Sequence, residues 1–221
     1  MNTIPVIAVD GPSASGKGTV AQLVAKQLGF HYLDSGALYR IVALAGKQAG
    51  IEWQDEAALS ALAATLNIEF EDGEIVLYGE IVSDAVRSEE MSRGASEVAV
   101  HPLVRRALFE VQRAFCKAPG LVADGRDMGS VVFPQAETKV FLTASAQVRA
   151  ERRYKQLIGK GNHANLAQIL ADIEARDARD MQRSAAPLRQ CEDAHLLDTS
   201  DLTIVQAVGA VLKQYRQTHK Q

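Results

Sequence analysis

Apolar positions follow two different periods along the chain, and these periods predict a succession of strands and helices. Short apolar runs typical of buried strands occur at residues 4–10, 30–34, 121–124, 139–144 and 195–200. Between them, apolar residues recur every three or four positions, which predicts helices over 17–28, 35–48, 54–66, 92–116, 145–158, 166–184 and 201–217. Strands that alternate with helices in this way predict an α/β fold with a parallel sheet flanked by helices.

One segment departs from this pattern. Residues 68–83, IEFEDGEIVLYGEIVS, alternate apolar and polar side chains on either side of Asp72 and Gly73. Alternation around an Asp-Gly pair is a strong signal for a β-hairpin. We therefore predict a small antiparallel sheet over 67–83, inserted into the parallel α/β chain.

The composition matters mainly for what it excludes. The 221 residues fit one domain with a small insert, and 47% are hydrophobic. No apolar run approaches the roughly 20 residues that span a bilayer, and the N-terminus lacks signal-peptide features, so we expect a cytoplasmic protein with no membrane partner. A net charge of −3 argues against nucleic acid as a partner. Cys116 and Cys191 lack metal-ligand spacing and are expected to be free, buried or half-buried thiols.

The positive charge is carried mostly by arginine, with 15 Arg against 9 Lys. A guanidinium group offers a planar fork that binds phosphate oxygens in pairs. Many of the arginines stand in short clusters, namely Arg105 with Arg106, Arg126, Arg149 with Arg152 and Arg153, and Arg176 with Arg179 and Arg183. Solvation of the surface explains any one of them, but the clustering favours phosphorylated ligands.

The strongest motif follows the first predicted strand and opens the first predicted helix. It consists of Gly11, Pro12, Ser13, Ala14, Ser15, Gly16, Lys17, Gly18 and Thr19. A glycine-rich loop in this place points backbone N–H groups at phosphate oxygens, and the helix N-terminus adds a positive dipole. We predict a P-loop for ATP in which Lys17 reaches the transferring phosphate. Gly18 stands where the consensus has Ser or Thr, so Thr19 is the predicted magnesium ligand, directly or through water.

A second motif, DSGALYR, occupies residues 34–40 at the end of the second predicted strand, where ligands of open α/β sheets bind. Ser35 is predicted to be the N-cap of the following helix. Arg40 would then be placed to hold a second phosphate, with Tyr39 beside it. The alternative is that Tyr39 belongs to the core and Arg40 to the surface.

A third motif follows residues 121–124. An acid at a strand end beside a P-loop commonly orders magnesium and its waters, which is the role predicted for Asp124. Gly125 lets the chain turn, so that Arg126 and Asp127 point over the cleft. The alternative is an ordinary turn with solvated charges.

A fourth motif lies within the predicted helix 166–184. At 100° per residue its charged side chains share one face, and these are Arg176, Arg179, Asp180 and Arg183. A solvated face with ion pairs at helical spacing explains such a run on its own. Beside a P-loop, the three arginines favour a clamp for phosphate groups.

Together these motifs resemble the cytidylate kinase family over nearly the whole chain. The resemblance is carried by VIAVDGPSASGKGT, YLDSGALYR, ADGRDMGSVVFP, RDARD and LLDTS. It implies a five-stranded parallel sheet with helices. It also implies a core of residues 1–34, 117–148 and 185–221, a monophosphate-binding region at 35–116 that contains the small antiparallel sheet, a lid at 149–163 and the Arg/Asp helix at 164–184.

The resemblance also implies roles for individual residues. Those expected to bind CMP are Ser35, Tyr39, Arg40, Ser96, Arg105, Arg126, Asp127, Arg176, Asp180 and Arg183. Among them Arg40, Arg126 and Arg183 would hold the acceptor phosphate and, with Lys17, serve catalysis. Tyr39, Arg176 and Asp180 would surround the ribose, and Ser96, Arg105 and Asp127 would read cytosine. From the lid, Arg152 or Arg153 would contact ATP.

The activity implied is Mg²⁺-dependent transfer of a phosphoryl group from ATP to CMP or dCMP, with UMP a poor substrate, by a monomeric enzyme. Two alternatives remain open at this stage. A GTPase switch would carry DxxG and NKxD, and neither is present. A kinase with a non-nucleotide acceptor would not need the charged groups assigned to the base.

Overall fold

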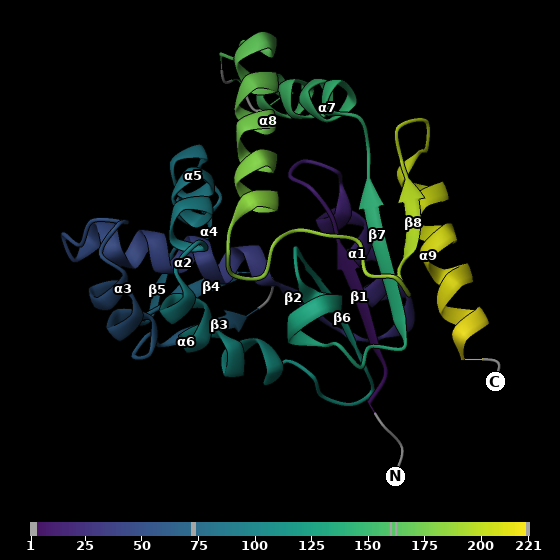
Figure 1. The fold of residues 1–221 in the computed structure, drawn as a ribbon, viewed down its shortest axis with the longest axis horizontal. Coiled ribbons are helices and arrows are strands. Elements are labelled where there is room, and N and C mark those ends of the chain that lie inside the picture. Colours follow the sequence, from purple (N-terminus) through teal and green to yellow (C-terminus); the bar gives the residue numbers. More distant parts are fainter. Residues whose placement is uncertain (1–3, 72–73, 160, 162, 220–221) are drawn as a thin grey trace. The chain divides into compact units, whose positions relative to one another are not determined.

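The computed structural model describes residues 4–71, 74–159, 161 and 163–219 (Figure 1). The chain forms two compact units, one made of Met1–Leu33 with Phe115–Gln221 and the other of Asp34–Ala114. We call them the P-loop unit and the α2–α6 unit and describe each by itself. The predicted Asp72-Gly73 turn lies outside the described residues, as do Lys160 and Asn162 of the predicted lid.

The P-loop unit is built on a five-stranded sheet. Its strands in chain order are β1 (Val6–Asp10), β2 (His31–Asp34), β6 (Leu121–Gly125), β7 (Thr138–Thr143) and β8 (His195–Asp198). The order across the sheet is β2-β6-β1-β7-β8, and β1 pairs in parallel with both β6 and β7. Strand β1, at the centre, is buried along its whole length, as its unbroken apolar run predicts. The predicted α/β fold class is confirmed.

The described helices of this unit are α1 (Lys17–Leu28), a π-helical turn η1 (Met128–Val132), α7 (Ala146–Gly159), α8 (Leu166–Gln182) and α9 (Ile204–Thr218). Apolar side chains of α1 and α9 form one core cluster with the strands, among them Val24, Ile7 and Val211. Helices α7 and α8 pack against each other (Figure 1). The turn η1 was not predicted.

Helix α1 shows how local sequence sets these elements. Its bounds match the prediction, and Val20 and Val24 are buried on its inner face. Gly29 takes the left-handed conformation, with φ 66°, and donates its N–H to the Ala25 carbonyl, which ends the helix.

The α2–α6 unit contains a three-stranded antiparallel sheet and helices. The strands are β3 (Ile68–Glu71), β4 (Glu74–Leu77) and β5 (Glu80–Ile81), and the helices are α2 (Ser35–Gln48), α3 (Glu56–Ala63), α4 (Ser83–Val86), α5 (Glu89–Val98) and α6 (Pro102–Arg113). The small antiparallel sheet predicted for 67–83 is therefore confirmed. No described helix in either unit is long and apolar enough to cross a membrane.

Two predictions about this unit were wrong. The single helix expected over 92–116 is two helices, because Pro102 opens α6 and its missing N–H is tolerated only at a helix start. The N-cap of α2 is Asp34 rather than Ser35, since Oδ1 of Asp34 accepts from the Ala37 N–H at 3.0 Å. Both residue types are good caps, so the pattern left a shift of one position open.

Candidate nucleotide-binding site

The loop between β1 and α1 has the shape of a phosphate-binding loop. A Cβ atom on Gly11 would stand 2.0 Å from the Leu142 carbonyl oxygen, so only glycine fits there. Gly16 has φ 88°, in the left-handed region that glycine adopts without strain. Lys17 is buried and its Nζ donates to the Pro12 carbonyl at 3.3 Å, across the loop. Ser15 Oγ is buried without a hydrogen-bond partner among the described residues, as expected of a group that meets a ligand.

Helices α7 and α8 hold this loop through its backbone. Arg149 donates from Nη1 to the Ser13 carbonyl at 2.9 Å and from Nη2 to Oδ2 of Asp177 at 2.6 Å. One turn further along α7, Arg152 donates from Nη1 to the Ser15 carbonyl at 3.4 Å and from Nη2 to the Thr199 carbonyl. The loop predicted to bind ATP is thus bonded to two arginines whose side chains contact its carbonyl groups.

A carboxylate lies beside the first turn of α1. Tyr32 donates its hydroxyl to Oδ2 of Asp124 at 2.5 Å, and the same oxygen would be 3.3 Å from a Cβ on Gly18. Asp124 is buried, whereas Thr19 is exposed. No group of three or more His, Cys, Asp or Glu side chains among the described residues is arranged to hold a metal ion. Asp124 is the buried carboxylate beside this turn and would be the candidate metal ligand.

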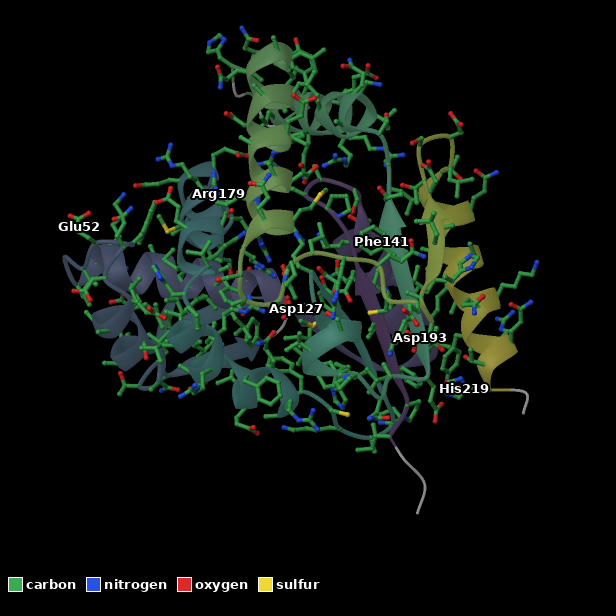
Figure 2. All side chains as sticks on the ribbon, viewed as in Figure 1. Glu52, Asp127, Phe141, Arg179, Asp193 and His219 are labelled. Atoms are coloured by element: carbon green, nitrogen blue, oxygen red, sulfur yellow. The ribbon has the colours of Figure 1, made fainter. Side chains whose placement is uncertain are left out.

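The turn after β6 carries a cluster of paired charges. Arg126 donates from Nε to Oδ2 of Asp180 at 2.8 Å, and Nη2 of Arg183 lies 3.8 Å from Oδ1 of Asp127. Figure 2 labels Asp127 in this turn and Arg179 on α8. Burial opposes ionisation of Asp180, but the attraction of Arg126 and of the neighbouring arginines outweighs it and lowers the pKa of Asp180. Asp180 is therefore held charged beside Arg126, whose own pKa is raised.

The backbone of the same turn is held by Asp10, at the end of β1. The two carboxylate oxygens of Asp10 accept from the N–H groups of Met128 and Gly129, each at 2.8 Å. Burial raises the pKa of Asp10 to about 6, and the two hydrogen bonds only partly oppose this effect. Asp10 thereby caps η1, the turn that directly follows Asp127.

The predicted residue Arg176 lies on α8. Five others lie in the α2–α6 unit, namely Ser35, Tyr39, Arg40, Ser96 and Arg105. Nη1 of Arg40 is 3.8 Å from Oδ2 of Asp34, and its Nε is buried without a hydrogen-bond partner in the described part of the chain. The Arg105 guanidinium lies over the Tyr39 ring, 5.5 Å from its centre. Ser35 and Ser96 are both buried.

Sequence reasoning missed four residues that the structure brings to the loop and turn, namely Asp10, Arg149 as a contact of the loop, Asp177 and Thr199. The resemblance to the cytidylate kinase family places Arg149 in the lid. Its partners Ser13 and Asp177 are 136 and 28 positions away along the chain, so no local pattern marked the contact. Asp10 ends an apolar run beside the P-loop, and its place at a strand end was the one signal it offered.

A glycine-rich loop that joins a central parallel strand to a helix, with a buried lysine at the helix start, defines a P-loop kinase. The chain belongs to the cytidylate kinase family, whose model matches residues 7–217. A relative from Chromobacterium violaceum named cytidylate kinase is 61% identical over 215 residues, 97% of each chain. A second of the same name, from Cupriavidus necator, is 59% identical over 215 residues, again 97% of each chain.

Among solved structures, a gluconokinase from Sinorhizobium meliloti superposes with a TM-score of 0.50 at 13% identity, covering 100% of this chain and 96% of its own. That likeness concerns the fold alone.

Proposed function

We propose that the enzyme transfers the γ-phosphoryl group of ATP to the 5′-phosphate of CMP and dCMP, and that UMP is a poor substrate. Family membership supports the choice of a cytidine acceptor, since the relatives at 61% and 59% identity are named cytidylate kinase. The P-loop geometry supports a nucleoside triphosphate as donor, because its backbone N–H groups and helix dipole favour a polyphosphate.

The observation that carries the proposal is the buried carboxylate of Asp127. Its side chain is 4% exposed and faces the Arg183 guanidinium, with one oxygen 3.8 Å from Nη2. A carboxylate in a site with little water accepts readily from an exocyclic amine, which cytosine has. Uracil presents a carbonyl at the same position, so two acceptors would oppose each other.

Transfer between two phosphates needs alignment and charge stabilisation more than proton abstraction, because the acceptor is already an anion. We assign Lys17 to the transferring phosphoryl group, where its ammonium offsets negative charge as the bond to ADP breaks. Arg126 and Arg183 would hold the acceptor phosphate. Arg176 and Asp180, on the same face of α8, would bind the ribose.

In the α2–α6 unit we propose roles in binding the acceptor nucleotide for Ser35, Tyr39, Arg40, Ser96 and Arg105. The buried Nε of Arg40, without a partner among the described residues, supports a charged ligand there. The contact of Arg105 with the Tyr39 ring supports a role for the pair at one nucleoside, since it fixes the direction of the guanidinium.

Magnesium fits the donors beside the P-loop. Mg²⁺ usually takes one or two carboxylates, substrate phosphates and several waters, and Asp124 supplies one buried carboxylate next to α1. We propose that Asp124 and Thr19 hold the ion, with water between Thr19 and the metal. When bound, Mg²⁺ draws negative charge from the phosphate oxygens and fixes their orientation.

A lid over residues 149–163 stays part of the proposal, because transfer to CMP requires that water be kept from the γ-phosphate. Of the arginines assigned to it, Arg149 is buried against the P-loop, while Arg153 donates to its neighbour Gln156 at 2.6 Å. Arg152 lies between them and is bonded to the loop at Ser15. We therefore assign the contact with ATP to Arg152.

Coupled measurement of ADP production tests the proposal. The purified enzyme is given ATP with Mg²⁺ and, separately, CMP, dCMP, UMP, AMP and GMP, with gluconate as a non-nucleotide acceptor. We expect kcat/KM for CMP and dCMP to exceed that for UMP by about tenfold or more, with little ATP hydrolysis when no acceptor is present. Equal rates with UMP, or turnover of gluconate and not of CMP, would contradict it.

A further inference from the structure

The backbone N–H and the backbone carbonyl of Ser13, within the P-loop, are both bound by one buried ion pair. Arg149 donates from Nη1 to the Ser13 carbonyl at 2.9 Å, and the Ser13 N–H donates to Oδ1 of Asp177 at 3.4 Å. Nη2 of Arg149 donates to Oδ2 of Asp177 at 2.6 Å and closes the ring. Both charged side chains are buried, and they come from α7 and α8.

The guanidinium of Arg149 has no freedom left to rotate. Its third nitrogen, Nε, donates to the Ala144 carbonyl at 2.9 Å, so three acceptors from three segments fix the plane of the group. A lysine has no planar fork and cannot make these three bonds at once. Because a buried ion pair contributes little net stability by itself, its main effect is on the conformation of what it holds.

The P-loop contains a residue with an unfavourable backbone conformation. Ala14, which follows Ser13, has φ 58°, in the left-handed region that residues other than glycine rarely adopt. Such a backbone persists only where surrounding contacts determine it. The bonds to the backbone N–H and carbonyl of Ser13 supply this constraint immediately before the strained residue.

We propose that Arg149 and Asp177 are positioning residues for the donor nucleotide, which act by fixing the backbone at Ser13 and with it the set of N–H groups that the P-loop offers to the ATP phosphates. Neither side chain is assigned a contact with ATP. This inference rests on the proposed function only in taking ATP as the ligand of the loop, and it makes no assumption about the acceptor.

Calorimetric titration separates this role from general stabilisation. ATP with Mg²⁺, and in a second series CMP, is titrated into the full-length wild type, Arg149→Lys and Asp177→Asn. We expect the dissociation constant of ATP to rise about tenfold or more in both variants, because a displaced loop loses the aligned geometry. The dissociation constant of CMP should stay within about twofold of the wild type in Arg149→Lys. Backbone amide hydrogen exchange over residues 11–16 of the folded protein should be faster in both variants than in the wild type.

Asp172→Asn is the matched control, since Asp172 is an exposed carboxylate on the same helix that accepts only from its neighbour Gln168 in the described contacts. It should leave ATP binding and loop exchange unchanged. If Asp177→Asn does not fold, Arg149→Lys decides alone, since it keeps the charge. ATP dissociation constants within about twofold of the wild type in the folded variants overturn the inference. A wild type that binds ATP without phosphorylating CMP overturns the proposed function instead, and leaves this comparison valid.

Discussion

Arg126 and Asp180 form a partly buried ion pair in which Nε of the arginine donates to Oδ2 of the aspartate at 2.8 Å, although the two residues are 54 positions apart. Burial disfavours the charge of Arg126, but Asp180 outweighs it and raises the pKa of the guanidinium. The pKa of Asp180 is lowered in turn. The pair joins α8 to the turn after β6, so the stability that it contributes to the fold should depend on pH.

We expect Asp180→Asn to destabilise the fold by about 1.5–3 kcal/mol at neutral pH, because Arg126, whose side chain is 16% exposed, loses a charge-assisted hydrogen bond and its counter-ion. Since the pKa of Asp180 is lowered in the folded state, the stability that its charge contributes is present above its unfolded pKa and is lost as pH falls through its folded value. Urea denaturation of wild type and variant at pH 7 and at successively lower pH measures this difference.

The exposed Asp172→Asn on the same helix serves as control and should change stability by no more than about 0.5 kcal/mol. If the difference between Asp180→Asn and the wild type does not shrink as pH falls below about 4, Asp180 is not the group that titrates.

Asp10 should show the opposite dependence on pH. Burial raises its folded pKa from 3.8 to about 6, so its contribution to stability is fully present below pH 3.8 and is lost as pH rises through about 6. The shift corresponds to about 3 kcal/mol. Relative to Asp10→Asn, which cannot titrate, the wild type should therefore lose up to about that amount of stability between pH 4 and pH 7. Parallel stability curves for the two proteins over this range would refute the assignment.

The elements that could be predicted from the sequence are those whose cause is local. A few consecutive residues determine each of three such features, namely the buried strand β1, the glycine-rich loop and the end of α1 at Gly29. Helix α1 has the predicted bounds. Helix α6 shows the limit of periodicity alone. The apolar spacing over 92–116 continues through Pro102, but proline cannot continue a helix and instead begins one.

The residues of the candidate site also divide into those that a local sequence pattern predicts and those that depend on tertiary contacts. The P-loop was predictable. The pairing of Arg126 with Asp180 depends instead on how α8 lies against the turn after β6, and that of Arg149 with Asp177 depends on how α7 and α8 pack. An Arg-rich helix looks alike in sequence whether its charges face water or one another. Burial distinguishes the two cases, and it is set by contacts between residues far apart in the chain.

Lys17→Ala should lower kcat by about a hundredfold or more, equivalent to about 3 kcal/mol of transition-state stabilisation. The variant can also lose stability, because the buried ammonium of Lys17 donates to the Pro12 carbonyl at 3.3 Å and lies near the charge of Asp10. Steady-state kinetics at saturating ATP and CMP, with thermal melts alongside, separate the two effects. Lys26→Ala, exposed in the last turn of α1, is the control. If the Lys17→Ala enzyme kept most of its kcat, the assignment of the P-loop to the donor phosphates would be refuted.

Recognition of the base gives the test with the sharpest contrast. Asp127 is proposed to accept from the cytosine amine, and uracil would oppose its carboxylate with a carbonyl. Losing that bond and opposing the dipoles costs about 1–3 kcal/mol, which is roughly ten- to two-hundredfold in kcat/KM between CMP and UMP. We therefore expect Asp127→Asn and Asp127→Ala to lower kcat/KM for CMP more than kcat/KM for UMP. The ratio of the two values should move closer to one.

Arg126→Ala provides the comparison that interprets the Asp127 variants. Arg126 is proposed to hold the phosphate, which CMP and UMP share, so its loss should lower kcat/KM for both alike and leave their ratio unchanged. Because Arg126 is also the partner of Asp180, this variant is measured at a temperature where thermal melts show it folded. An unchanged ratio in both Asp127 variants would exclude Asp127 from base recognition. Cytosine would then have to be read by Ser96 and Arg105, since these are the other residues assigned to the base.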